Sequence, residues 1–244
     1  MKKLFFYLSF SVFFISISCN TEASVVGASS LEGVWSLKTA SGGIAGIHYK
    51  YNSGHILFDF NKTSKTLTVI KATSINDTYS PIGIGTFDFS IQENGTNFIL
   101  VTDDHSGGNS IKINCSLGSD GTTLTILGNG ADAISYELIK ESAKVTVAEL
   151  EAKRQEIITY INSFTCSESF GCSFIGFGSK ACGGPNEYLV FSNNVDLPHL
   201  KGMVTAYNDL ENLYNVQNNV VSDCMYVMPP NKVGCVNEVC TIIN

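Results

Sequence analysis

The chain has 244 residues, with 15 lysines and arginines against 22 aspartates and glutamates, and its formal net charge is −7 at pH 7. The basic residues form no cluster, so the sequence argues against nucleic acid as a partner. Charged residues make up only 15% of the chain, below the usual quarter, which suits an exported protein rich in strands.

The N-terminus has the layout of an export signal. Lys2 and Lys3 precede an almost uninterrupted apolar run from Leu4 to Ile17. This run is shorter than the roughly 20 residues that a membrane-spanning helix needs. We therefore expect residues 1–18 to be a signal peptide that is removed on export.

The end of this leader indicates whether the protein is anchored to a membrane. Ser16-Ile17-Ser18-Cys19 resembles the lipobox of bacterial lipoproteins, although that family prefers a bulky aliphatic residue where Ser16 stands. The resemblance implies that Cys19 is the first mature residue and carries a diacylglyceryl group, with 19–29 as a linker. The protein would then be an outer membrane lipoprotein of the bacterial cell envelope, facing the periplasm or the surface. The alternative is a plain secretory signal with an incidental cysteine.

The cysteines are distributed unevenly. Six of the eight lie near the C-terminus, at Cys166, Cys172, Cys182, Cys224, Cys235 and Cys240. In an oxidising compartment such a set predicts three disulfides, with a pairing that the sequence does not determine. No C-x-x-C pair supports a zinc site, so we expect no metal. Cys115 shares the apolar side of a strand with Ile111 and Ile113, which predicts a buried free thiol. Cys19 is then left without a disulfide partner and available for acylation. A disulfide between Cys19 and Cys115 would also account for all eight cysteines.

Between residues 30 and 140 the chain repeats short alternating or β-branched runs separated by turns, as half-buried strands require. Asn94-Gly95 and Asp120-Gly121 are turn signals between two such runs. The expected strands are 34–37, 46–51, 55–60, 66–70, 85–91, 98–101, 111–115, 123–127 and 134–138. Strands joined by hairpins over this length predict an antiparallel barrel or sandwich.

The motif Gly33-Val34-Trp35 favours the barrel, because it resembles the G-x-W of the first strand of lipocalins. The segments HILFDFNKTSKTLTV, GTFDFSI and TLTILGNGADAISYELIK extend the likeness to lipocalin-like domains of bacterial envelope lipoproteins. It implies an up-and-down barrel over 30–140, with the indole at the closed end and room for at most one small apolar ligand. Trp35 and four phenylalanines are equally suited to pocket lining and to plain core: Phe58, Phe60, Phe87 and Phe89.

Residues 144–244 are expected to form a small α+β module stapled by disulfides. Thr146 and Glu149 have capping-box spacing before an apolar stripe, and Asp196 with Pro198 marks a second helix start. We expect a strand from Tyr188 to Phe191 and an extended segment from Cys224 to Pro230. The combination of CGGPNEYLVFS, SDCMYVMPP and a terminal cysteine pair is similar to a recurring exported module of Gram-negative bacteria, which implies no known activity.

We find no catalytic motif, and we expect no enzyme activity and no cofactor. Gly176 to Ala181 lacks the third glycine of a dinucleotide fingerprint. His48 and His55 flank a predicted hairpin and could face each other as metal ligands, but two surface histidines explain them better. The acidic loop at Asp103-Asp104-His105 lacks the ligand alternation of calcium loops.

The sequence thus predicts a lipid-anchored, non-catalytic envelope protein whose barrel binds a small hydrophobic ligand. The alternative is a scaffold whose cysteine-rich module binds a protein or glycan partner.

Overall fold

The computed structural model describes residues 31–72, 79–94, 97–103, 110–128, 130, 132–167 and 169–243. The expected signal peptide, Cys19 and the whole linker lie outside the described residues, as do Gly95 and the acidic loop after Asp103.

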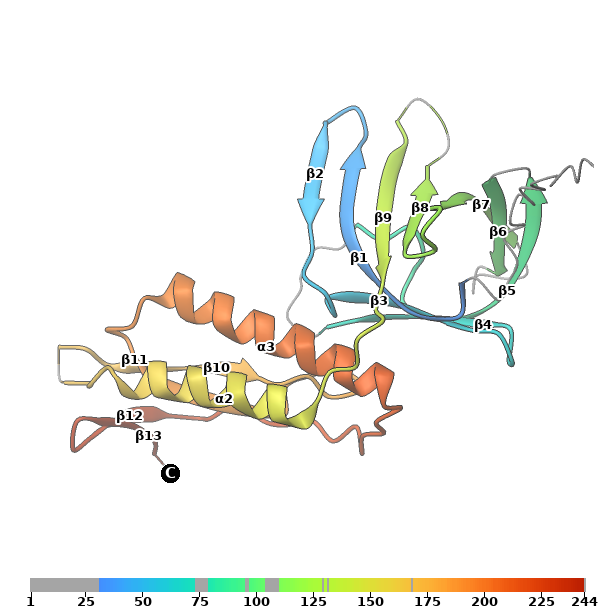
Figure 1. The fold of residues 1–244 in the computed structure, drawn as a ribbon. Helices are drawn as coiled ribbons and strands as arrows, with labels where there is room; N and C mark the ends of the chain where they lie inside the picture. Colours follow the sequence, from blue (N-terminus) through green and yellow to red (C-terminus); the bar gives the residue numbers. More distant parts are fainter. Residues whose placement is uncertain are drawn as a thin grey trace, which may run out of the picture.

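The first part of the chain forms a closed antiparallel β-barrel (Figure 1). Its eight strands are β1 and β3 to β9, which pair in chain order, and β9 pairs with β1 to close the sheet. The predicted antiparallel barrel is therefore confirmed. The short strand β2 adds to one end of β1. The bounds are β1 Gly33–Gly42, β2 Ile47–Lys50, β3 Ile56–Asn61, β4 Thr66–Lys71, β5 Gly85–Asn94, β6 Asn97–Asp103, β7 Ser110–Leu117, β8 Thr123–Leu127 and β9 Ile134–Lys140.

Strand β1 extends beyond the predicted range 34–37 to Gly42, because a bulge lets it continue past the end of the alternating pattern. Its register with β9 shifts between Leu37 and Thr39, which leaves Lys38 as an extra residue. Such a bulge bends a strand and increases its twist. The first half of β1 therefore pairs with β3 and the second half with β2.

The second part of the chain is an α+β module held by disulfides, as the cysteine pattern predicts. Thr146 caps the first helix by accepting a hydrogen bond from the Glu149 amide, and Asp196 caps the second by accepting one from the His199 amide. The terminal hairpin was not predicted from the sequence. The elements are α2 Val147–Asn162, β10 Cys172–Phe177, β11 Glu187–Ser192, α3 Leu197–Gln217, β12 Val233–Val236 and β13 Val239–Ile242. We call α2 to β13 the C-terminal module.

Disulfides hold the terminal hairpin and the tail that leads to it. Two of them join the β12–β13 hairpin to the neighbourhood of β10: Cys166–Cys235 and Cys172–Cys240. The third, Cys182–Cys224, ties the loop after β10 to the extended tail. Among the described cysteines Cys115 alone is free, and it is buried.

Helix α3 joins the two parts of the chain. Its C-terminal part lies beneath β3 in Figure 1, with the β12–β13 hairpin on the far side of the module. Val34, Leu57 and Ile70 point out of the barrel and pack into the hydrophobic core of the module. Leu57 is 0% exposed although it alternates with the inward side chains of Ile56 and Phe58. This explains the non-alternating run at the start of β3, because both faces of that strand are covered.

Candidate functional site

The lower part of the barrel is a packed core. Trp35 is 0% exposed, and its indole N–H donates to the Leu31 carbonyl at 2.8 Å. The Lys140 ammonium lies 5.3 Å from the centroid of the indole ring, within the range of a cation–π contact. The indole thus closes this end of the barrel, as the G-x-W motif predicts.

The four phenylalanines proposed as core or lining are also buried, and all belong to one continuous hydrophobic cluster with Trp35. The rings of Phe60 and Phe89, for example, meet edge to face with centroids 5.4 Å apart. These aromatic side chains therefore form the barrel core.

A hollow of about 300 Å³ lies at the opposite end, the barrel mouth. Residues of β7, β8 and β9 line it, together with Ser80 and Pro81 from the connection that follows β4. Ile113 and Ile126 form its apolar base, and Tyr136 brings a phenol to it. Burial raises the pKa of the Tyr136 phenol, so this hydroxyl remains protonated and can donate.

The connection from Tyr79 to Ile82 folds over the mouth. Ile82 is buried in the barrel core, and the Tyr79 ring stacks on that of Tyr49 at 4.7 Å between centroids. The Tyr51 hydroxyl donates to the Tyr79 carbonyl at 3.4 Å. The mouth is therefore narrowed by tyrosines, which combine an apolar ring with a polar tip.

Two other groups inside the barrel are chemically distinctive. Thr102 is 1% exposed, and its hydroxyl oxygen has no hydrogen-bond partner among the described residues. An unpaired buried hydroxyl is costly, so it is a natural place for a polar ligand atom. Burial raises the pKa of the Cys115 thiol to about 12, which makes it a poor nucleophile.

The two histidines near the β2–β3 connection have separate surroundings. His48 is exposed on β2, opposite Ser41 of β1. His55 is mostly buried, with its Nδ1 atom 2.9 Å from Asp209 Oδ1 on α3. The structure thus gives His55 a partner across the junction and contradicts its placement among surface histidines.

That contact belongs to a polar seam between the barrel and α3, which sequence reasoning missed. Asp209, only 1% exposed, also accepts a hydrogen bond from the Asn52 amide at 3.0 Å. Asn212 donates to the Gly54 carbonyl at 2.7 Å. The sequence feature that could have predicted these contacts is the recurrence of Asn or Asp along one face of α3, at positions 208, 209, 212 and 215, all of which are buried.

The glycine-containing segment after β10 is occupied by side chains of α3. The Gly178 amide donates to Asn208 Oδ1 at 2.7 Å, and the Ser179 amide donates to Glu211 Oε2 at 2.6 Å. Burial raises the pKa of the Glu211 carboxyl, and the hydrogen bonds that it accepts from the Ser179 amide and the Asn186 side chain oppose the shift. The backbone groups that would cradle a phosphate already have internal partners.

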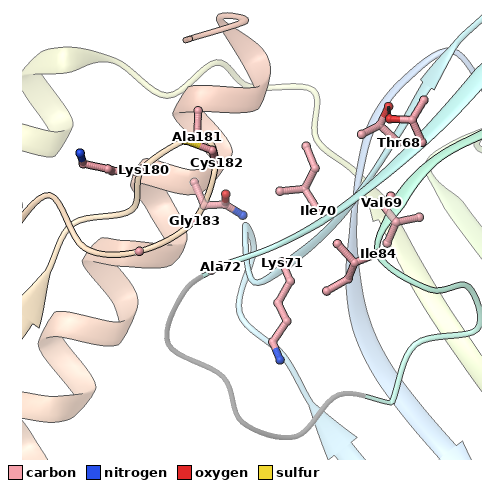
Figure 2. Close-up of a pocket in the computed structure, with 14 residues that line it drawn as sticks. Thr68, Val69, Ile70, Lys71, Ala72, Ile84, Lys180, Ala181, Cys182 and Gly183 are labelled. Atoms are coloured by element: carbon pink, nitrogen blue, oxygen red, sulfur yellow. Dashed lines mark hydrogen bonds between the residues drawn. The ribbon is translucent and has the colours of Figure 1, made fainter. Parts of the chain in front are cut away.

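A second hollow, of about 470 Å³, lies at the junction between the barrel and the module. Figure 2 shows Ile70 of β4 facing the loop that contains Ala181, Cys182 and Gly183. The Lys180 ammonium donates to the Met225 carbonyl at 2.7 Å and so holds this loop against the tail.

The sulfur atoms of Cys166, Cys172 and Cys240 lie within 4.8 Å of one another. All three belong to disulfides, and a disulfide-bonded cysteine offers no thiolate to a metal. Spacing along the chain gave no hint of this cluster, because the hairpin brings distant cysteines together.

Comparison with known protein families finds no family model that matches the chain. The comparison with curated proteins likewise finds no significant match. No helix in the described part of the chain is long and apolar enough to cross a membrane.

Proposed function

We propose that this is an exported, non-catalytic binding protein of the bacterial cell envelope, anchored to the outer membrane by lipid on Cys19. Three disulfides support export, because such bonds persist in oxidising compartments. The lipobox-like sequence before Cys19 supports the anchor. The His55–Asp209 pair and Glu211 hold the fold together in the buried seams described above, which supports a non-catalytic role.

The ligand of this proposal is a small apolar molecule at the mouth of a lipocalin-like barrel. The hollow lined by Ile113, Ile126 and Tyr136 carries this proposal, because pockets for small molecules combine apolar walls with a few polar groups. The packed aromatic floor limits the ligand to the upper part of the barrel. A single polar atom on the ligand would find the Tyr136 hydroxyl at the mouth or the Thr102 hydroxyl within the barrel.

The binding test uses N-phenylnaphthylamine, a small neutral fluorophore, with the purified protein. We expect its fluorescence to rise on binding and to be lost in Ile111→Trp, because Ile111 lines the mouth and an indole there fills the hollow. The matched control is Val221→Trp, which adds the same ring at a tail position that is 91% exposed. Equal binding by the two variants would contradict the proposed site.

The anchor is tested by the intact mass of the mature protein extracted from membranes. We expect a protein that starts at Cys19 and carries acyl chains, and Cys19→Ser should release it from the membrane fraction. A mature protein that starts elsewhere and carries no acyl mass would support the plain secretory signal.

The second candidate function is a scaffold whose C-terminal module binds a protein or glycan partner. It is favoured by a further hollow, of about 480 Å³, that lies within the module and not in the barrel.

A further inference from the structure

The hollow in the C-terminal module lies between β10 with the turn after it and α3. Ile175 and Val204 give it an apolar base, and Gly176, Gly178 and Pro185 contribute backbone and ring atoms. Its other lining residues are Tyr188, Lys201, Thr205 and Asn208. The hollow therefore combines an aromatic ring with several hydrogen-bonding groups.

The aromatic side of the hollow is held in place by its neighbours. The Tyr188 ring meets the Phe174 ring edge to face, with centroids 5.6 Å apart and an interplanar angle of 86°. A Cβ on Gly176 would lie 3.3 Å from Pro185 and 3.7 Å from Tyr188, so both rings lie over a bare backbone. This packing fixes the orientation of Tyr188 before any ligand arrives.

The polar side of the hollow contains a hydrogen-bond donor that no described residue uses. Asn208 is 4% exposed and lines the hollow. Its Oδ1 atom must face the Gly178 amide, since an N–H group needs an acceptor, and this fixes which end of the side chain is the NH₂ group. That NH₂ group donates to no described residue. Because Asn208 lines the hollow, this donor can pair with an acceptor atom of a ligand there.

Two further polar side chains stand at the rim of the hollow, one turn apart on the same helix. Thr205 is partly buried, and Lys201 is exposed and forms no ion pair with any described residue. Together with Asn208 they offer an amide, a hydroxyl and an ammonium group at four-residue and three-residue steps along α3.

We propose that this hollow binds a sugar ring of an envelope glycan. The apolar C–H face of a sugar ring packs on an aromatic ring, here Tyr188, while its hydroxyl groups hydrogen-bond Asn208, Thr205 and Lys201. The inference rests on the second candidate function, and it names the partner class and the site. It does not depend on a ligand in the barrel.

The test is saturation-transfer-difference NMR on the full mature chain with disulfides intact. The probes are the methyl glycosides of glucose, galactose, mannose and N-acetylglucosamine. We expect at least one of them to receive saturation, strongest on the protons of one ring face. In a ¹⁵N-labelled sample the Asn208 side-chain amide signal, assigned from its absence in Asn208→Asp, should shift as that glycoside is added.

The variants separate stacking from general loss of structure. Tyr188→Ala removes the ring and should weaken binding about tenfold or more, whereas Tyr188→Phe keeps the ring and should stay within about threefold. Thr205→Phe fills the hollow from the helix side and should abolish binding even if Tyr188→Ala is poorly folded. Far-UV circular dichroism and the melting temperature report folding for each variant.

The outcomes are distinguishable from those of the barrel test. Ile111→Trp closes the barrel mouth and should leave the glycoside signal unchanged. No saturation of any probe, or a signal that persists in folded Tyr188→Ala and Thr205→Phe, would overturn the proposal. A signal abolished by Ile111→Trp would place the sugar in the barrel and overturn it as well.

Discussion

Gly178 occupies a position that is unfavourable for any residue with a side chain. Its φ is +84°, and a Cβ there would lie 2.7 Å from Asn186 Nδ2 and 2.8 Å from Glu211 Oε2. The same residue donates its amide proton to Asn208. A side chain at this position would therefore add backbone strain and push apart the groups that order the loop after β10.

We expect Gly178→Ala to lower the free energy of unfolding by about 1 to 3 kcal/mol. The control is Gly183→Ala, where φ is +91° but no atom lies within 4 Å of the added Cβ. It should cost about 1 kcal/mol, because it adds only left-handed strain. Urea unfolding under oxidising conditions measures both, and equal losses would show that the close contacts contribute nothing.

Glu211 gives the molecule a pH dependence with a definite sign. Burial raises the pKa of its carboxyl in the folded state, so the folded protein binds that proton more tightly than the unfolded chain does. The contribution of Glu211 to stability is therefore fully present below the ordinary pKa of a glutamate. It falls as the pH rises from that value through the raised folded-state pKa.

The matched variant is Glu211→Gln, which keeps an oxygen acceptor for the Ser179 amide and does not titrate. We expect the stability of the wild-type protein relative to Glu211→Gln to fall as the pH rises through this window, and then to level off. Urea midpoints measured from acidic to neutral pH give the difference. A difference that moves in favour of the wild-type protein would mean that hydrogen bonding to the ionised carboxylate outweighs desolvation.

At the scale of one element, α3 buries both apolar and polar side chains. Leu200 and Val204 pack in the hydrophobic core of the module, whereas Asp209 and Asn212 bond the barrel. Each buried asparagine or aspartate side chain on this helix forms at least one hydrogen bond with the barrel or with the loop after β10. The helix therefore orients the barrel against the module by hydrogen bonds, which are directional, as well as by apolar burial.

A double-mutant cycle on His55→Ala and Asp209→Ala tests this junction. We expect Asp209→Ala to cost about 1 to 3 kcal/mol and the two residues to show a coupling of at least about 0.5 kcal/mol. The same cycle on Lys180 and Asp223, an ion pair in which Asp223 is largely exposed, should give about 0 to 1 kcal/mol. A His55–Asp209 coupling near zero in urea unfolding would contradict a stabilising role.

At the scale of the whole molecule, the disulfides constrain only the module. The loops closed by Cys166–Cys235 and Cys172–Cys240 span 69 and 68 residues. By chain entropy either bond alone would contribute about 4 kcal/mol, because closing such a loop restricts the unfolded chain, and the second bond adds less because the two loops overlap. The barrel contains no cystine among its described residues, and its strands are closed by hydrogen bonds.

Reduction should therefore affect the two parts unequally. Trp35 is the only tryptophan and lies in the barrel core, so its fluorescence reports barrel unfolding, while far-UV circular dichroism at helix wavelengths reports α2 and α3. In a thiol reductant we expect the helical transition to move to lower urea concentration than the Trp35 transition. Coincident transitions under reducing conditions would show that the junction makes the whole chain one cooperative unit.

Much of this architecture could be predicted from local patterns. Alternating or β-branched runs between turn signals located all nine strands of the first part, because most of these strands have one side chain pointing into the barrel and the next pointing out. Thr146 and Asp196 marked both helix starts, because free amides at a helix start need acceptors. The β12–β13 hairpin was missed, since its short strands are exposed and carry little hydrophobic pattern.

The candidate sites were decided by the tertiary structure. The sequence by itself determined that the barrel interior is apolar and that the module is cysteine-rich. Only the fold decided that the phenylalanines fill the floor while Tyr136 lines the mouth, that Asp209 meets His55, and that Asn208 faces a hollow beside Tyr188. These groups are far apart in the chain, and their positions depend on how the sheet closes and how α3 packs, which local propensity does not encode.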